Sequence, residues 1–264
     1  GNHEFDYGIE NLRMRAREAR FPFLAANIKS KDKDSQLDFA APFRIFEVSG
    51  IKVGVLGLGY KNTPFETHPK RVKSLEFLDY EPTIRMWVPK IRELGANVVI
   101  AVVHDTNPTV KKVAEAIKDL DIPVFFGGQQ HQYAYSFLKN SDPNKEIIIL
   151  NPGGFGRSYA RVDLIFDRKN KTYLGFKAKI EMVIGRIDKP EYPADEQVAE
   201  LVKKIVQSSD KEDELLGDIE TPLAVGNFNN SPLGHWVVDS WLASVPKADF
   251  AICNFGAFRQ PLPS

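Results

Sequence analysis

The sequence holds a single cysteine, Cys253, among 264 residues, and it shows neither an internal repeat nor a low-complexity tract. One cysteine cannot pair within its own chain, which rules out a disulfide framework. No apolar run approaches the roughly 18 residues that a membrane-spanning helix needs. Lys and Arg together number 35 and so do Asp and Glu, so the formal net charge is zero. This balance argues against a general binder of polyanions and predicts no polymeric nucleic acid as a partner.

The chain also lacks an initial Met and a leader in which an apolar run follows a charged one, so the sequence as given shows no secretory signal. What it does have is the composition of a globular protein, with 43% hydrophobic and 27% charged residues. A domain of ordinary size has roughly 150 residues, so the length favours about two domains.

The first two thirds of the chain alternate helical and strand patterns. Apolar residues recur at helical spacing over 8–19, and segment 43–58 has the pattern of a hairpin that turns at Ser49-Gly50. The continuous apolar run at 97–103 is typical of a strand buried on both faces. Two further helices are expected, one opened by Glu81-Pro82 and one capped by Asn107-Pro108. Further strands are expected at 122–126, 146–150, 161–166 and 173–180. This order predicts the α/β class.

Gly and Pro residues mark a boundary near 185–193. An amphipathic helix follows, with its apolar face carried by Val198, Leu201, Val202, Ile205 and Val206. A second unit is expected from about 219, with a helix around 233–243 and a strand at 248–253. Roughly 45 residues are too few for a stable domain, so we expect this second unit to be incomplete.

Two histidines follow predicted strands directly. His104 comes after the strand at 97–103, and His131 comes after the strand at 122–126 through Gly127-Gly128. Ligands of α/β sheets bind beyond the carboxyl ends of the strands, so both are candidates for a metal or substrate site. Of the remaining histidines, we expect His68 to be solvated and His235 to be a packing residue of a helix.

The first residues, Gly1-Asn2-His3-Glu4, are followed by Asp6. An Asn carbonyl oxygen can bind a metal, and a neighbouring His can act as a general acid. A carboxylate three residues further on can hold that imidazole in one tautomer and favour its charged form. From this chemistry alone, a polar segment that merely precedes the helix at 8–19 remains an equal alternative.

Eight segments carry a resemblance to one family, in that family's own order. They are GNHEFDYG (1–8), FPFLAANI (21–28), KVGVLGLGYKNTP (52–64), the strand ending in VVH (102–104), DIPVFFGG (121–128), NPGGFGRSYARVDL (151–164), SPLGHWVVDSWL (231–242) and ADFAICNFGAFR (248–259). Together they resemble the calcineurin-like metallophosphoesterases, and within them the 5′-nucleotidase and 2′,3′-cyclic phosphodiesterase branch. The combination of GNHE, VVH, a Gly-Gly segment with His, and N-x-G-x-x-R is far more specific than GNHE alone.

The resemblance implies a four-layer β-sandwich flanked by helices, followed by a linker helix and the start of an α/β nucleotide-binding domain. It implies a hydrolase that releases phosphate from nucleotides, in which two divalent ions (Zn, Mn or similar) supply a metal-bound hydroxide. The residues that it assigns are His3 and Asp6 as the catalytic pair, Asn2, His104, Gln129 and His131 as metal ligands, and Asn254, Gly256 and Arg259 as the binding site for the substrate.

Two departures from the family pattern affect this expectation. The family's upstream Asp-x-His and Gly-Asp motifs are not in the chain, so we expect a fragment that is inactive alone. Its parts would be 1–187, the phosphoesterase domain, 188–218, a linker with a helix, and 219–264, the start of the substrate domain. In addition, Gln129 stands where a second-metal His is usual. Gln is a weaker oxygen ligand than imidazole for zinc-like ions, so we expect either a reduced affinity for the second metal or a preference for a harder ion.

Several alternatives therefore stay open. The chain could come from a non-catalytic or decayed family member that binds nucleotide or a protein partner, an alternative that rests on Gln129. Within the enzyme hypothesis, nothing separates nucleoside monophosphates from cyclic nucleotides, nucleotide sugars or thiosulfate-type esters. The resemblance implies export to the periplasm, the cell surface or the medium, with which one cysteine is compatible.

Overall fold

The computed structural model describes residues 1–183, 193–208, 217–227, 229–258 and 260–262. The chain divides into two compact units, Gly1–Pro193 and Ala194–Ser264. Within the described residues, no helix is both long enough and apolar enough to cross a membrane.

A six-stranded mixed sheet is the centre of the first unit. Its four inner strands are parallel, and an antiparallel strand closes each edge. Parallel inner strands are buried on both faces, which explains their nearly continuous apolar sequences. In spatial order the strands are β3 (Phe43–Val48), β4 (Ile51–Leu58), β6 (Val98–Val103), β7 (Val124–Phe126), β9 (Glu146–Pro152) and β8 (Tyr133–Lys139).

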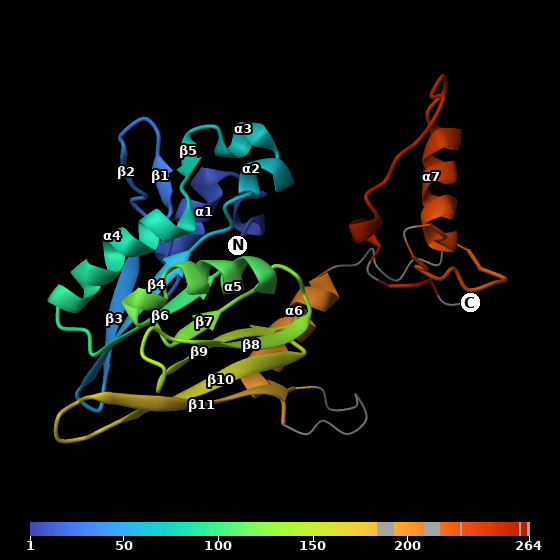
Figure 1. Cartoon of the computed structure of the whole chain (residues 1–264). Coiled ribbons are helices and arrows are strands. Elements are labelled where there is room, and N and C mark those ends of the chain that lie inside the picture. Colours follow the sequence, from blue (N-terminus) through green and yellow to red (C-terminus); the bar gives the residue numbers. More distant parts are fainter. Residues whose placement is uncertain (184–192, 209–216, 228, 259, 263–264) are drawn as a thin grey trace. The chain divides into compact units, whose positions relative to one another are not determined.

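Different layers cover the two faces of this sheet. Helices α4 (Tyr80–Glu93) and α5 (Asn107–Ala116) lie on one face, where Ile84 and Val110 are fully buried against the strands (Figure 1). The hairpin of β10 (Ser158–Phe166) and β11 (Tyr173–Met182) packs its apolar side chains against β7 and β9 on the other face.

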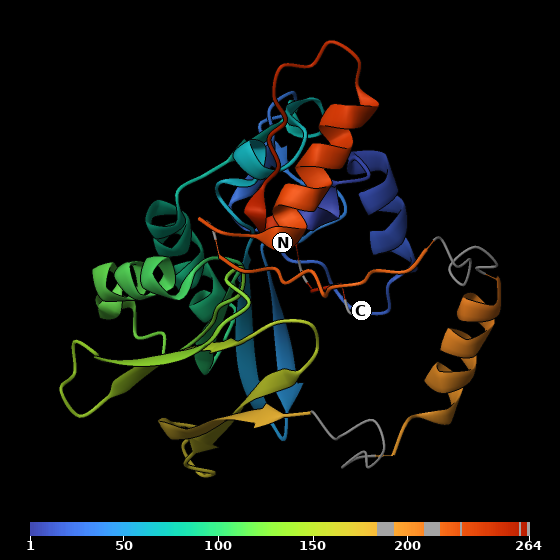
Figure 2. The same cartoon turned by 90° about the vertical axis from the view of Figure 1, so that its right-hand side faces the viewer.

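A smaller sheet lies at the end of the unit away from that hairpin (Figures 1 and 2). The apolar cluster at this sheet includes Phe5 and Leu12, so the first residues of the chain pack against the sheet. The elements of this part are the short helix η1 (His3–Phe5), α1 (Ile9–Glu18), the sheet of β2 (Ser35–Gln36), β1 (Ile28–Ser30) and β5 (Leu75–Phe77), α2 (Thr63–Glu66) and α3 (Pro69–Val72); η2 (Lys118–Leu120) follows α5.

The second unit contains α6 (Glu196–Ser208), α7 (Pro232–Ser244) and the short helix η3 (Phe255–Ala257). The predicted apolar face of α6 is present and exposed within this unit. At the start of α7 the Ser231 hydroxyl accepts from the Gly234 amide at 2.9 Å, which is a normal N-cap contact.

The mixed α/β class expected from the sequence is confirmed, and so are the hairpin at 43–58 and the strand-helix-strand unit around His104. Three details are wrong. Segment 248–253 is not a strand, because no described segment pairs with it; Phe250 and Ile252 are exposed instead. His235 is exposed rather than packed. The N-cap of α5 is Thr106, one residue before the expected Asn107.

Candidate active site

The first six residues form a tight turn at the edge of the smaller sheet. Phe5 is 3% exposed and meets Phe77 edge-on, with ring centroids 5.7 Å apart. This anchor fixes the neighbouring residues of η1, so Asn2 is buried while His3 is exposed. The two neighbouring polar side chains therefore differ in environment, since that of Asn2 is shielded from solvent and that of His3 is open to it.

The side-chain amide of Asn2 has only one of its two ends satisfied. Its Nδ2 donates to Oε2 of Glu66 at 3.0 Å. Its Oδ1 is buried and has no hydrogen-bond partner among the described residues. A buried carbonyl oxygen without a donor is rare in native proteins, and a bound cation would satisfy it.

His3 and Asp6 form the predicted pair. Nδ1 of His3 and Oδ2 of Asp6 are 2.6 Å apart, and the Thr67 hydroxyl donates to Oδ1 of Asp6 at 3.0 Å. The hydrogen bond with His3 holds the pKa of Asp6 below its usual value, because that bond favours the carboxylate form. This carboxylate fixes the tautomer with hydrogen on Nδ1, so the other ring nitrogen is left to face solvent or a ligand.

His104 lies where β6 ends, at the carboxyl edge of the parallel strands. Two glycines lie against its ring, where a larger residue would clash. A Cβ on Gly1 would lie 2.8 Å from Nε2, and a Cβ on Gly128 would lie 2.9 Å from Nδ1. The ring of Tyr60 stands edge-on to it at 6.3 Å. Burial lowers the pKa of His104, a shift that a hydrogen bond with Gln129 opposes. The neutral imidazole that burial favours is the form that binds metals.

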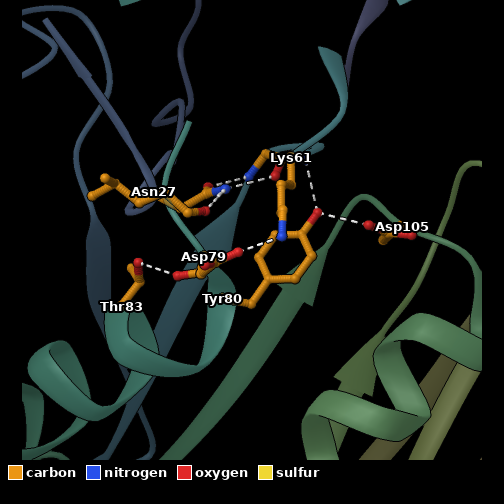
Figure 3. A network of polar contacts seen from close by, with 8 residues as sticks. Asn27, Lys61, Asp79, Tyr80, Thr83 and Asp105 are labelled. Carbon is orange, nitrogen blue, oxygen red and sulfur yellow. Dashed lines mark hydrogen bonds and ion pairs between the residues drawn. The ribbon is translucent and has the colours of Figure 1, made fainter. Parts of the chain in front are cut away.

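The turn after His104 is held by a buried carboxylate (Figure 3). Asp105 is 4% exposed; its Oδ2 accepts from the Tyr80 hydroxyl at 2.8 Å and its Oδ1 accepts from the Thr106 amide at 2.7 Å. The same Tyr80 oxygen accepts from the Lys61 amide at 2.9 Å. Burial raises the pKa of Tyr80, so its hydroxyl remains a donor. The network ties the loops after β4 and β6 together.

The two glutamines after Gly127-Gly128 have different contacts. Gln129 has a positive φ of 58°, and its Nε2 donates to Oε2 of Glu66 at 2.9 Å. Gln130 instead accepts from the backbone amide of Asn107 at 3.0 Å, which supports the start of α5. Gln129 is therefore the one whose hydrogen bonds connect it with Asn2, through Glu66.

His131 contacts the loop that follows β9. It too has a positive φ, of 55°, and its ring meets Phe155 edge-on with centroids 5.2 Å apart. A Cβ on Gly154 would lie 2.9 Å from the Cβ of His131. His131 therefore packs on the loop that follows β9, and its predicted role as a metal ligand stays a prediction.

A cavity of about 300 Å³ lies beside His104. The carboxyl ends of β4, β6 and β7 border it, and its lining includes Gly1, Gly57, His104 and Gly128. The glycines at positions 1 and 128 leave room next to the imidazole. The cavity lies where a ligand of a parallel sheet is expected.

Two residues that contact the predicted site were not found from the sequence. Glu66 ends α2 and Thr67 follows it; Glu66 contacts Asn2 and Thr67 contacts Asp6. The helix α2 thus supports the first residues of the chain from the side. Their position in the sequence could have indicated them, because they lie in the loop after β4. Ligands bind beyond the carboxyl ends of the strands, and this rule, which selected His104, applies to that loop as well.

The predicted substrate residues lie in the second unit. Oδ1 of Asn254 accepts from the backbone amide of Gly256 at 2.9 Å, so this side chain caps η3. Arg259 lies outside the described residues. The predicted roles of all three stay predictions.

The described residues contain no group of three or more His, Cys, Asp and Glu side chains arranged to hold a metal. They do offer an unpartnered buried oxygen on Asn2 and the His104 imidazole, whose neutral form burial favours. Gln129 adds a further amide. Amide oxygen and imidazole are both ligands of divalent ions, so these residues fit part of a metal centre.

Comparison with known proteins gives relatives of two kinds. No family model matches the chain. The human protein named 5′-nucleotidase is 30% identical over 189 residues, which cover 65% of this chain and 32% of that protein. A Bacillus subtilis protein named endonuclease YhcR is 24% identical over 99% of this chain and 22% of its own length. The chain thus spans about a third, or less, of these curated relatives.

A solved structure has the same fold. The structure of the 5′-nucleotidase precursor from Thermus thermophilus matches all of this chain and 54% of its own, with a TM-score of 0.81 and 21% identity. At this identity the likeness concerns the fold. The architecture that positions the candidate site is therefore found in a protein that bears that name.

Proposed function

We propose that the chain belongs to the 5′-nucleotidase family of calcineurin-like phosphoesterases, as its relatives and fold support, and that the whole protein is a metal-dependent phosphoester hydrolase acting on nucleotides. Divalent ions, when bound, supply positive charge to the phosphate oxygens and lower the pKa of water. The observation that carries the proposal is the buried, unpartnered Oδ1 of Asn2, which lies in the segment where the resemblance assigns a metal ligand.

The chain's own residues would perform three tasks. Asn2, His104 and Gln129 would hold one ion, and His131 would serve the other. His3 would protonate the leaving oxygen from the ring nitrogen opposite Nδ1, while Asp6 and Thr67 keep that ring oriented.

The remaining parts of the proposal concern the whole protein. We propose that 1–187 is the phosphoesterase domain, that 188–218 links it to the next domain, and that 219–264 begins a domain for the nucleotide. Asn254, Gly256 and Arg259 would contact the substrate there, with the Arg guanidinium suited to phosphate. Relatives named 5′-nucleotidase support nucleotides as the substrate, and we infer an extracytoplasmic location from the same family.

The test is a substrate panel on the full-length protein, with Zn²⁺, Mn²⁺, Mg²⁺ and Ca²⁺ each returned after treatment with chelator. The panel contains nucleoside monophosphates, cyclic nucleotides, a nucleotide sugar and a single-stranded oligonucleotide. We expect metal-dependent release of phosphate from a mononucleotide. Metal binding without turnover of any ester would favour the non-catalytic alternative that Gln129 suggested.

A substitution at His3 tests the proposed acid. His3→Ala should slow ester cleavage by about 10²–10⁴-fold, the usual contribution of a general acid, and should leave the metal content unchanged. The matched control is His68→Ala, which changes an exposed histidine whose ring caps the short helix α3. Equal turnover of the His3 variant and wild type would remove His3 from the mechanism.

A further inference from the structure

Glu66 is the carboxylate that joins the candidate metal ligands. One oxygen, Oε2, accepts from Nδ2 of Asn2 at 3.0 Å and from Nε2 of Gln129 at 2.9 Å. The other, Oε1, accepts from the hydroxyl of Tyr60 at 2.8 Å. Glu66 is exposed as a residue, yet both of its oxygens are occupied by donors from three separate segments of the chain.

These contacts determine which end of each amide faces the site. A carboxylate accepts hydrogen bonds and cannot donate them, so it holds the NH₂ end of an amide and turns the oxygen away. For Asn2 the oxygen turned away is the buried Oδ1 that has no partner among the described residues. For Gln129, whose Nε2 donates to Glu66, the oxygen turned away is Oε1.

Tyr60 keeps the carboxylate itself in place. Burial raises the pKa of Tyr60, so the hydroxyl stays protonated and donates to Glu66. The same ring stands edge-on to His104 at 6.3 Å. Glu66 is therefore held by a residue that also packs against the histidine of the site.

We propose that Glu66 is a positioning residue for a divalent cation: it orients the amides of Asn2 and Gln129 so that their oxygens can bind the ion. The inference rests on the proposed function, because it assumes that Asn2 and Gln129 are ligands. Residues that orient metal ligands typically contribute 10–100-fold to metal affinity.

The test measures Mn²⁺ affinity of the metal-free full-length protein, using the electron paramagnetic resonance signal of free Mn²⁺. Glu66→Ala should bind Mn²⁺ about 10–100-fold more weakly. Glu66→Gln should stay within about threefold of wild type, since its amide oxygen can accept from both ligands while its NH₂ donates to the Tyr60 oxygen. The control Glu115→Ala removes an exposed carboxylate of α5 and should change nothing.

Each outcome decides a separate point. Wild-type protein that binds no Mn²⁺ would refute the proposed function and this inference with it. Wild-type binding with equal affinity in Glu66→Ala would overturn only the role of Glu66. Equal losses in the Ala and Gln variants would mean that charge, and not orientation, matters, which also overturns the proposal. If Glu66→Ala does not fold, Glu66→Asp replaces it, because its shorter side chain withdraws the oxygen from both amides.

Discussion

Removing the hydroxyl of Tyr80 should destabilise the first unit by about 2–4 kcal/mol. Tyr80 and Asp105 are each 4% exposed, so water does not easily replace a lost contact (Figure 3). Tyr80→Phe keeps the ring and creates almost no cavity, but it removes the 2.8 Å bond to Asp105 and the 2.9 Å bond from the Lys61 amide. A hydrogen bond to a charged group contributes roughly 1.5–3 kcal/mol and a neutral one roughly 0.5–1.5.

Urea unfolding followed by circular dichroism measures this loss, as a lower midpoint at an unchanged slope. Because burial raises the pKa of Tyr80, the hydroxyl donates throughout pH 6–9 and the loss should not depend on pH in that range. The control is Tyr7→Phe, at a tyrosine that is 82% exposed. A difference below about 0.5 kcal/mol between Tyr80→Phe and wild type, the size of an ordinary surface effect, would refute the reasoning.

Three further predictions concern other contacts. Tyr173→Phe should raise the unfolding free energy by about 1 kcal/mol in a urea titration, because it removes a buried hydroxyl with no partner among the described residues, and an equal or lower stability would contradict this. Asp6→Asn should be less stable than wild type near pH 6, and the thermal midpoints of the two proteins should converge below about pH 4. The reason is that His3 lowers the pKa of Asp6 in the folded state. The stabilisation by Asp6 is therefore fully present above the pKa of the unfolded state and is lost as the pH falls through the pKa of the folded state. Gln129→His should raise the ratio of Zn²⁺ to Mn²⁺ affinity in competition titrations, because imidazole suits zinc better than an amide oxygen does; an unchanged ratio would mean that residue 129 is not a ligand.

Periodicity and turn residues were sufficient for the elements with long, regular patterns. The parallel strands around 97–103 and 122–126 could be predicted because burial on both faces makes their sequences almost wholly apolar. The edge strand β8 was missed although Tyr133, Tyr135 and Phe137 alternate along it. Its aromatic side chains are the exposed ones, while the smaller Ala134 and Leu138 face inward, so its pattern differs from that of an ordinary half-buried strand.

The strand expected at 248–253 fails for a related reason. Its alternating residues fit a strand, but a strand exists only when another segment pairs with its backbone, and the described residues contain no such segment. Pairing between distant segments is not visible in a local pattern. The same limit applies to Glu66, since its contacts with Asn2 and Gln129 cross 64 and 63 positions of the chain.

The contact between Gln129 and Glu66 also changes what the unusual glutamine means. From the sequence alone, Gln129 replaces a usual histidine, and it is compatible with a weaker second metal site, with a harder ion or with a decayed site. In the structure its amide has an acceptor on one side and His104 on the other. The same acceptor holds Asn2, whose oxygen is left buried and unpartnered. An amide orients an oxygen toward a cation only if its NH₂ is held elsewhere, and Glu66 does this for both residues. Under the proposed role of Glu66, the glutamine and the carboxylate would act as one arrangement, which would suit a harder ion than zinc.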